Sequence, residues 1–457
     1  MRTPARSSDD LDAAESSPAA TAGGGTAPRR PAPSIDRRQL LGAAVGLASA
    51  WAAPMAFGAG RGNPGQGRLV LIFLRGAYDG LSALVPIGER DYYRMRPTIA
   101  IGAPDGTNET ALALDSLFGL HPALAPVLPL WQQGVLTAVP AAGSPADTRS
   151  HFEAQHDWEV GIPGQRAHVD GWMNQLATGL QRRSATAPDA TVALDVGEAN
   201  PAILAGAAPV QRVARGVAAT RGGVLANAGA RAAVLSLYAG NDALSESFRS
   251  GAQSRMQTVE TLSMAEDMAP QGDARAREMQ AANNGAAPAG SLLQDSQHLA
   301  TLMRANRRLR LGFLSAGGWD THANQGDHRG ALANNLAALA ATLVQLRRSF
   351  SEPDDVVLVA SEFGRTSAEN GSRGTDHGHG NLMWLLGSRV QGGRWHGGWN
   401  GLASGNLHEQ RDLPVLNDFR AVIAQALRAT QGLTANELDR LFPGFSWDRS
   451  LDGLFKA

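Results

Sequence analysis

Residues Ser361 to Gly380 read SEFGRTSAENGSRGTDHGHG, and they follow directly on the apolar run VVLVA at Val356 to Ala360. A short apolar run of this kind predicts a fully buried strand, and loops after strands are where open α/β sheets carry their sites. The loop contains carboxylates, imidazoles and a guanidinium, at Glu362, Arg365, Asp376, His377 and His379. Imidazoles and carboxylates together bind zinc, manganese and similar cations. The stretch therefore predicts a metal site, with a solvated polar loop as the alternative.

Two further apolar runs also end in candidate ligands. Arg68 to Leu74, RLVLIFL, predicts the first buried strand, and Asp79 follows it in a turn flanked by glycine. Leu311 to Leu314 predicts a short strand that leads to Asp320 and His322. Residues two apart on extended backbone face the same side, so Asp320 and His322 can bind one ion. A tight turn capped by Asp320 is the alternative.

The remaining pattern predicts an α/β fold with a doubly wound, mostly parallel sheet. Further strands are predicted at 135–140, 191–195 and 381–386, and helices at 121–133 and 329–348. The chain should thus begin as a βαβ unit. Residues 230–310 are rich in Ala, Gln, Met and Arg with helical spacing, which predicts a helical insertion within a domain at 66–457.

The N-terminal part has the features of an export signal. Residues 1–34 are rich in Ala, Pro, Gly and Ser and are predicted to be disordered. Paired arginines, Arg37 and Arg38, then precede a moderately apolar stretch, so residues 35–59 predict a twin-arginine signal peptide. A membrane anchor is the alternative, but the stretch is shorter than the roughly 20 residues of a spanning helix. We therefore expect the twin-arginine translocase as a partner, a periplasmic or secreted location, and no stable membrane span after cleavage.

Composition excludes several classes of protein. The 457 residues include 41 basic and 42 acidic side chains, for a net charge of -1, and no basic run is interleaved with aromatics. Nucleic acid is therefore not an expected partner. The chain has no cysteine, which excludes disulfides, thiolate ligands and a cysteine nucleophile. Any metal must bind oxygen and nitrogen ligands.

A candidate nucleophile follows the strand at 135–140. Ser150 and Glu153 match a capping box, which would place Ser150 at the N-cap of a helix. The hydroxyl either caps the helix or, at the positive end of the helix dipole, acts as a nucleophile. Thr148 is its nearest competitor. His151 and His156 are expected to contact substrate, to pack or to cap.

Carboxylate-rich sites with a nearby hydroxyl suit two-metal chemistry on phosphoryl or sulfuryl centres. Arg75 and Arg365 could then bind the equatorial oxygens, because guanidinium groups match such anions.

Several motifs together resemble one bacterial family. They are FLRGAYDGLSALVP at 73–86, SHFEAQ at 150–155, GGWDTH at 317–322, SEFGR at 361–365, GTDHGHG at 374–380 and NDFRAV at 417–422. With the twin-arginine signal, these motifs resemble the domain-of-unknown-function 1501 (DUF1501) family, which is grouped with the alkaline phosphatase and sulfatase superfamily. The resemblance covers nearly everything after the signal, and it implies an alkaline-phosphatase-like fold with a metal site in strand-end loops.

The resemblance also implies roles for individual residues. Asp79 resembles the metal Asp after the first strand of the superfamily, and Ser150 stands at the nucleophile's position. Asp320 and His322 resemble an Asp-x-x-x-His pair with shorter spacing, and His377 resembles the final metal His. Glu362 stands at an Asp-His pair but is followed by Phe363, so one metal centre loses an imidazole. The formylglycine signature of sulfatases is missing, which disfavours sulfatase activity.

These observations predict an exported metal-dependent hydrolase of small phosphate or related esters, with Ser150 and Arg365 as catalytic residues. The predicted metal ligands are Asp79, Asp320, His322, Glu362, Asp376, His377 and His379. The expected cofactor is a divalent metal, zinc first, with manganese, calcium or magnesium as alternatives. An exported protein of the same fold that binds a metal or ligand without turnover is the competing prediction.

Overall fold

The structure is a computed structural model that describes residues 66–165, 170–184, 190–197, 201–219, 228–263, 283 and 286–456. The predicted disordered tract at 1–34 and the predicted signal at 35–59 lie outside the described residues. Within the part of the chain that is described, no helix is both long and apolar enough to cross a membrane.

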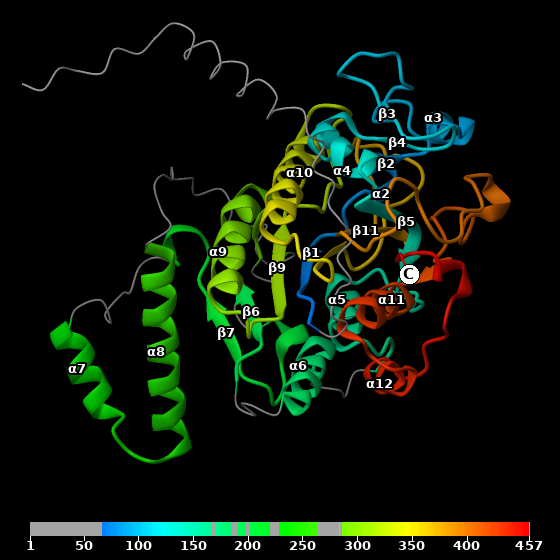
Figure 1. Cartoon of the computed structure of the whole chain (residues 1–457). Coiled ribbons are helices and arrows are strands. Elements are labelled where there is room, and N and C mark those ends of the chain that lie inside the picture. The colour runs from blue at the N-terminus through cyan, green and yellow to red at the C-terminus, as the bar shows by residue number, and fades with distance from the viewer. Residues whose placement is uncertain are drawn as a thin grey trace, which may run out of the picture. The chain divides into compact units, whose positions relative to one another are not determined.

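One large sheet forms the centre of the domain (Figure 1). Across the sheet, the strands are β12 (Asn417–Asp418), β5 (Leu136–Gly143), β11 (Asn381–Gly387), β10 (Val356–Ala360), β1 (Leu69–Leu74), β9 (Leu311–Gly317), β6 (Ala193–Val196) and β7 (Val210–Val213). A short strand, β8 (Ala287–Pro288), pairs with β9. β1 lies between β10 and β9 and runs parallel to both, so the loops after these strands lie at the same edge of the sheet.

Helices cover both faces of this sheet, as its buried apolar strands require. In β1, Val70, Ile72 and Leu74 belong to one core, whereas Leu69, Leu71 and Phe73 belong to the other. The first core contains side chains of η1 (Pro122–Val127), α4 (Leu128–Gln132), α9 (Leu292–Ala305) and α10 (Ala331–Ser349). The second contains side chains of α5 (His151–Val160), α6 (Trp172–Arg183), α11 (Phe419–Gln431) and α12 (Ala435–Leu441). The predicted α/β class with a doubly wound, mostly parallel sheet is therefore confirmed.

The two strands of the predicted βαβ start, β1 and β5, run parallel in the same sheet. They are not neighbours, because β11 and β10 lie between them. β11 runs antiparallel to both β10 and β5. The connection from β10 to β11 contains no helix, and a crossover of a dozen or more residues, usually helical, is what a parallel return would use. The chain therefore turns back after residues 361–380.

Smaller elements lie outside the main layers. A second sheet has the order β2 (Leu84–Val85), β4 (Gly119–Leu120) and β3 (Leu112–Ala113), and two short helices, α2 (Gly80–Ala83) and α3 (Arg90–Met95), precede it or lie between its strands. Described residues of the predicted insertion at 230–310 form α8 (Ala243–Ser263), α9 and most of α7 (Ala228–Leu237). α9 packs against β6, β9 and α10, so it is part of the layer that covers the sheet.

Candidate metal centre

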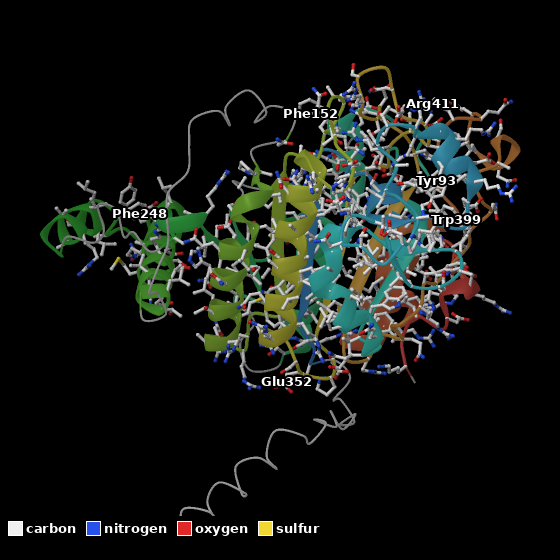
Figure 2. The ribbon with its side chains drawn as sticks, turned by 90° about the horizontal axis from the view of Figure 1, so that it is seen from above. Tyr93, Phe152, Phe248, Glu352, Trp399 and Arg411 are labelled. Atoms are coloured by element: carbon white, nitrogen blue, oxygen red, sulfur yellow. The ribbon has the colours of Figure 1, made fainter. Side chains whose placement is uncertain are left out.

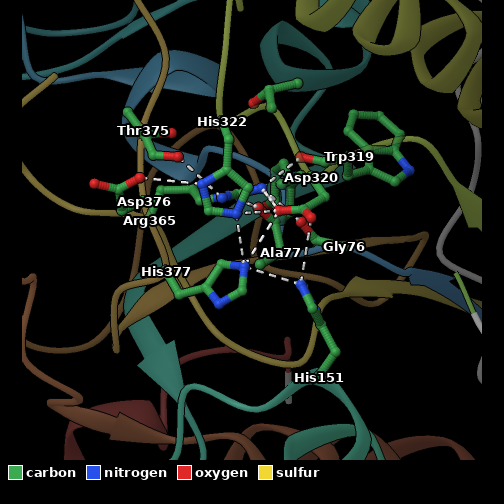
Figure 3. Close-up of polar contacts among 12 residues, drawn as sticks. Gly76, Ala77, His151, Trp319, Asp320, His322, Arg365, Thr375, Asp376 and His377 are labelled. Carbon is green, nitrogen blue, oxygen red and sulfur yellow. Dashed lines mark hydrogen bonds and ion pairs between the residues drawn. The ribbon is translucent and has the colours of Figure 1, made fainter. Parts of the chain in front are cut away.

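Segments that follow separate strands bring imidazoles and a carboxylate together (Figure 3). His151 is the first residue of α5, the helix that follows β5. Asp320 and His322 follow β9, and His377 lies in the loop between β10 and β11. The prediction that Asp320, His322 and His377 lie together therefore agrees with this geometry.

The side-chain tips of these residues converge. Nε2 of His377 lies 3.0 Å from Nε2 of His151 and 2.9 Å from Nε2 of His322. Oδ1 of Asp320 lies 3.0 Å from Nε2 of His322 and 3.3 Å from Nε2 of His377. His151, Asp320 and His377 each offer one ligand atom, and these atoms all lie within 4.8 Å of one another. His322 adds a fourth donor on the more exposed side of the group.

Each of the three imidazoles has an acceptor at its other nitrogen. Nδ1 of His151 lies 2.8 Å from Oε1 of Glu362, and Nδ1 of His322 lies 3.1 Å from Oδ1 of Asp376. Nδ1 of His377 lies 2.9 Å from the carbonyl oxygen of Arg149. A carbonyl or an ionised carboxylate can only accept, so each Nδ1 carries the proton. In the neutral rings, the Nε2 lone pairs therefore face one another.

This arrangement fits a divalent cation. Nitrogen lone pairs 2.9 to 3.0 Å apart repel each other unless a proton or a metal ion lies between them. Ligands at Zn–N distances of about 2.0 to 2.1 Å in a tetrahedron lie roughly 3.3 to 3.4 Å apart, close to the separations found here. Metal-bound histidines also commonly donate the second ring N–H to a carboxylate or a backbone carbonyl. His151, Asp320 and His377, with His322, are the residues that would bind the ion.

The charges around His151 show how strongly this group attracts a cation. Burial alone would lower the pKa of His151, but hydrogen bonds and charges of Asp320 and Glu362 outweigh it and raise that pKa to about 9. Burial would raise the pKa of Asp320, yet hydrogen bonds from His151 and His377 and the charge of Arg365 hold it well below its usual range. The carboxylates thus stay ionised at neutral pH, and a proton or a metal ion balances them.

Glu362, a predicted ligand, lies behind His151 and not beside the ion position. Its buried carboxylate accepts from Nδ1 of His151, from the backbone N–H of Gly76 at 2.8 Å and from Nε2 of Gln155 at 3.0 Å. Burial would raise the pKa of Glu362, but the hydrogen bond and charge of His151 lower it to about 2. Because His151 intervenes, Glu362 orients that imidazole and increases its basicity.

Phe363, the residue after Glu362, packs beside two of the imidazoles. Its ring centroid lies 5.0 Å from those of both His151 and His377, and the side chain is buried. An apolar ring at this position restricts the two imidazoles and excludes water from one side of them. Phe363 thus helps to fix the positions of His151 and His377.

Arg365 was predicted to be catalytic, but its guanidinium is used within the protein. It donates to the carbonyl oxygens of Ala77 at 2.7 Å, Thr375 at 3.0 Å and Gly76 at 3.0 Å. It also contacts Oδ1 of Asp320 at 2.5 Å. A buried guanidinium with these partners cannot bind a substrate oxygen, so Arg365 positions Asp320.

The backbone beside Arg365 depends on Gly76. Gly76 has φ +111°, and a Cβ there would lie 2.7 Å from the backbone nitrogen of Asp320. The next residue, Ala77, has φ 59°, an unusual value for a residue with a side chain. Its carbonyl is bonded to Arg365. The loop after β1 is therefore held in a strained conformation against Asp320.

Ser150 lies at the N-cap of α5, as the sequence predicted, but its side chain makes no capping hydrogen bond. Thr148 donates to Oε2 of Glu153 at 2.8 Å instead, so the predicted capping box does not form. No partner for the Ser150 hydroxyl is found among the described residues. Ser150 is half-buried. In the sequence it lies between Arg149, whose carbonyl accepts from Nδ1 of His377, and His151.

The structure does not bring Asp79 or Arg75 to this group. Asp79 caps α2 and forms a buried ion pair with Arg96, with N–O distances of 2.6 and 3.1 Å. Burial would raise the pKa of Asp79, but the charge and hydrogen bonds of Arg96 lower it. Arg75 is buried and bonded to Gln155. The partner Arg96 was not foreseen because it comes from a separate segment, after α3.

Two other predicted ligands have different surroundings. Asp376 accepts from Nδ1 of His322, so it lies behind an imidazole as Glu362 does. His379 is not part of the group, and its ring lies 4.6 Å from that of His408. Conversely, sequence reasoning gave His151 only a substrate-contact, packing or capping role. Its place directly after a candidate N-cap and a strand was the one signal that could have identified it as a ligand.

Comparisons with known proteins point to one family. The model of the family described as "Protein of unknown function (DUF1501)" matches residues 137–442. No curated protein sequence matches the chain. Among solved structures, alkaline phosphatase from the Antarctic bacterium TAB5 matches with 11% identity and a TM-score of 0.29, over 70% of this chain and 91% of that one. A cold-active alkaline phosphatase from a psychrophilic Shewanella species matches with 10% identity and a TM-score of 0.25, over 65% and 68%.

Proposed function

Since the chain belongs to the DUF1501 family, a family of unknown function, we propose its activity from the site itself: metal-dependent hydrolysis of a phosphate or related ester. The observation that carries the proposal is the convergence of Nε2 atoms from His151, His322 and His377 on Asp320, each ring with its Nδ1 held by an acceptor. Such a donor set suits zinc or manganese better than calcium or magnesium, which prefer oxygen ligands.

A bound divalent cation would supply Lewis-acid polarisation of the ester oxygens. The protein would contribute the rest. His151, Asp320 and His377 would hold the cation, while Glu362 keeps the proton on Nδ1 of His151. Ser150 would supply the nucleophilic hydroxyl, because it has no capping role and lies next to a ligand.

The start of α5 would bind the negative charge of the ester. The backbone N–H groups of the first turn lack intrahelical partners, and the helix dipole places partial positive charge there. The turn begins at His151, so the cation and these N–H groups would lie on the same side of the reacting centre. This arrangement replaces Arg75 and Arg365, whose guanidinium groups are occupied.

The substrate we propose is a small ester outside the cytoplasm. We further propose export through the twin-arginine translocase to the periplasm or the medium, directed by residues 35–59. The paired arginines and the short apolar stretch support this assignment. Testing it requires a fusion of residues 1–65 to a reporter that is active only outside the cytoplasm. Replacing Arg37 and Arg38 by lysine should block its export.

The hydrolase proposal is tested by metal analysis and ester turnover on the same preparation. The purified protein should contain zinc or manganese and should cleave an aryl phosphate, phosphodiester or sulfate ester. Ser150→Ala should abolish turnover and keep the metal, while the matched Thr148→Ala variant should keep both. Metal without turnover on any of these esters would instead favour the competing role, a protein that binds a metal or ligand without catalysis. The occupied guanidinium groups of Arg75 and Arg365 are the observation that favours this second role.

A further inference from the structure

A second group of imidazoles and carboxylates lies beside the candidate metal centre and shares no side chain with it. We call Asp147, His379, His408 and Glu409 the His408 cluster. Asp147, His408 and Glu409 each offer an atom within 4.8 Å of the others. His379 joins them through its ring, whose centroid lies 4.6 Å from that of His408.

One imidazole nitrogen of the His408 cluster is buried without an ordinary hydrogen-bond partner. His379 packs its ring against the ring of His408, and only 8% of the His379 surface is exposed. Nε2 of His408 is buried and makes no hydrogen bond, although Oδ2 of Asp147 lies 3.3 Å away. A buried polar group without a partner costs about 1 to 3 kcal/mol. This nitrogen, beside two carboxylates that each offer a ligand atom within 4.8 Å, therefore indicates that a cation belongs there.

The surrounding charged side chains leave a negative charge that a cation would balance. Arg149 is shared between Glu409 and the buried Asp412, and Arg411 also bonds Asp412. Three carboxylates thus face two guanidinium groups, and no arginine among the described residues pairs with Asp147. Figure 2 labels Arg411, whose side chain is 43% exposed. With neutral imidazoles, the group keeps an excess of one negative charge.

The backbone holds the His408 cluster in a fixed turn. His408 and Asp412 exchange two backbone hydrogen bonds, both of 2.9 Å. The turn between them places Glu409 and Gln410 at φ 51° and 56°. It lies against the segment at 147–149 through the ion pairs of Arg149.

We propose that the His408 cluster is a second cation site, separate from the candidate metal centre, in which His408, Asp147 and Glu409 bind a transition-metal dication such as Zn²⁺ while His379 packs beside the ligand His408. The imidazole favours zinc, manganese or iron over calcium and magnesium, which prefer oxygen ligands. The ion would fasten the turn at 408–412 to the segment that precedes Ser150. Its role would be to fix the position of Arg149, whose carbonyl holds His377.

Metal stoichiometry tests this inference. The purified full chain is saturated with Zn²⁺, freed of excess by gel filtration and analysed by inductively coupled plasma mass spectrometry. We expect two equivalents in the wild type and one equivalent each in His408→Ala and Asp320→Ala. Losing a ligand should weaken Zn²⁺ binding by more than the roughly 10- to 100-fold that loss of an outer hydrogen bond costs. His328→Ala is the matched control. Asp327 and Glu109 lie 3.1 and 3.8 Å from its ring nitrogens, and no third ligand joins them among the described residues.

The outcomes separate this site from the candidate metal centre. If the wild type binds one equivalent of zinc, and Asp320→Ala loses it while His408→Ala keeps it, the second site is overturned and the proposed function stands. If His408→Ala loses that equivalent while Asp320→Ala keeps it, the second site is supported and the first is overturned. Asp147→Asn, at a half-exposed side chain, is the second variant if His408→Ala does not fold. A folded wild type that binds no zinc would also overturn the second site. The same holds if folded His408→Ala and Asp147→Asn lose all of their zinc, because the two sites would then not be separate.

Discussion

Replacing Glu362 by glutamine changes the charge behind His151 with little change of shape. Oε1 of Glu362 accepts from Nδ1 of His151, the N–H of Gly76 and Nε2 of Gln155. An amide oxygen can keep these contacts. Oε2 contacts the hydroxyl of Ser361, which also donates to a backbone carbonyl, so an amide NH₂ can donate to that hydroxyl. The variant should therefore fold.

The expected effect is on metal affinity. The carboxylate makes His151 a stronger electron donor, and its hydrogen bonds and charge, with those of Asp320, raise the pKa of that imidazole to about 9 against the opposing effect of burial. A neutral amide keeps the ring orientation but removes the charge. Loss of such an outer carboxylate typically weakens metal binding about 10- to 100-fold, which corresponds to roughly 1.4 to 2.8 kcal/mol.

Competition with a chromophoric chelator measures the Zn²⁺ dissociation constant of wild type and variant, and circular dichroism checks the fold. Asp376→Asn is the matched control, because Asp376 supports His322 in the same way but is 53% exposed, so water screens its charge. We expect its effect to be smaller than that of Glu362→Gln. Wild-type affinity in a folded Glu362→Gln protein would refute the argument that the carboxylate tunes His151.

Three further predictions concern stability. Asp79→Asn leaves the buried Arg96 guanidinium without its counter-charge, so urea unfolding should show a loss of about 3 to 5 kcal/mol. The folded-state pKa of Asp79 is lowered. The stability that this ion pair gives the wild type should therefore be fully present above the unfolded-state pKa of about 3.9, and it should be lost as the pH falls through the folded-state pKa. The variant should lack this acid dependence. Gly76→Ala places a Cβ 2.7 Å from the backbone nitrogen of Asp320 at φ +111°, so it should lower the free energy of unfolding by more than about 1 kcal/mol. Gly179→Ala, in open space on α6, is the control and should be neutral or stabilising. Thermal unfolding of the two variants measures the difference. Removing the metal by a chelator should lower the free energy of unfolding by about 2.7 kcal/mol relative to protein with free Zn²⁺ at a hundred times its dissociation constant.

Local patterns in the sequence were sufficient for the long central strands and for part of the site, but not for β7, β12 or the short strands of the second sheet. The apolar runs at β1, β9 and β10 are buried on both faces, so they appear as continuous hydrophobic stretches. Asp320, His322 and His377 were predicted from their positions after such strands. The antiparallel direction of β11 was missed, because that depends on the path of a loop and not on periodicity.

The residues that sequence reasoning misplaced share a physical cause. Asp79, Glu362 and Asp376 are carboxylates after strands or in the central loop, as predicted, but each is engaged by a partner from a distant segment. Arg96 pairs with Asp79, while His151 and His322 stand between the other two carboxylates and the ion position. The sequence shows which carboxylates are present, but it does not show which guanidinium or imidazole contacts each of them in the fold.

Three consecutive residues at the start of α5 connect these observations. The carbonyl of Arg149 accepts from Nδ1 of His377, the Ser150 hydroxyl makes no capping hydrogen bond, and Nε2 of His151 faces the ion position. The guanidinium of Arg149 also reaches Asp412 in the turn of the His408 cluster. Any displacement of the helix start would therefore move a ligand, the candidate nucleophile and the acceptor that fixes His377 at the same time. Adjacent residues are linked by rigid peptide units, so a change at this turn alters metal affinity and the position of the Ser150 hydroxyl together. Variants that loosen the turn should therefore lose both metal affinity and turnover.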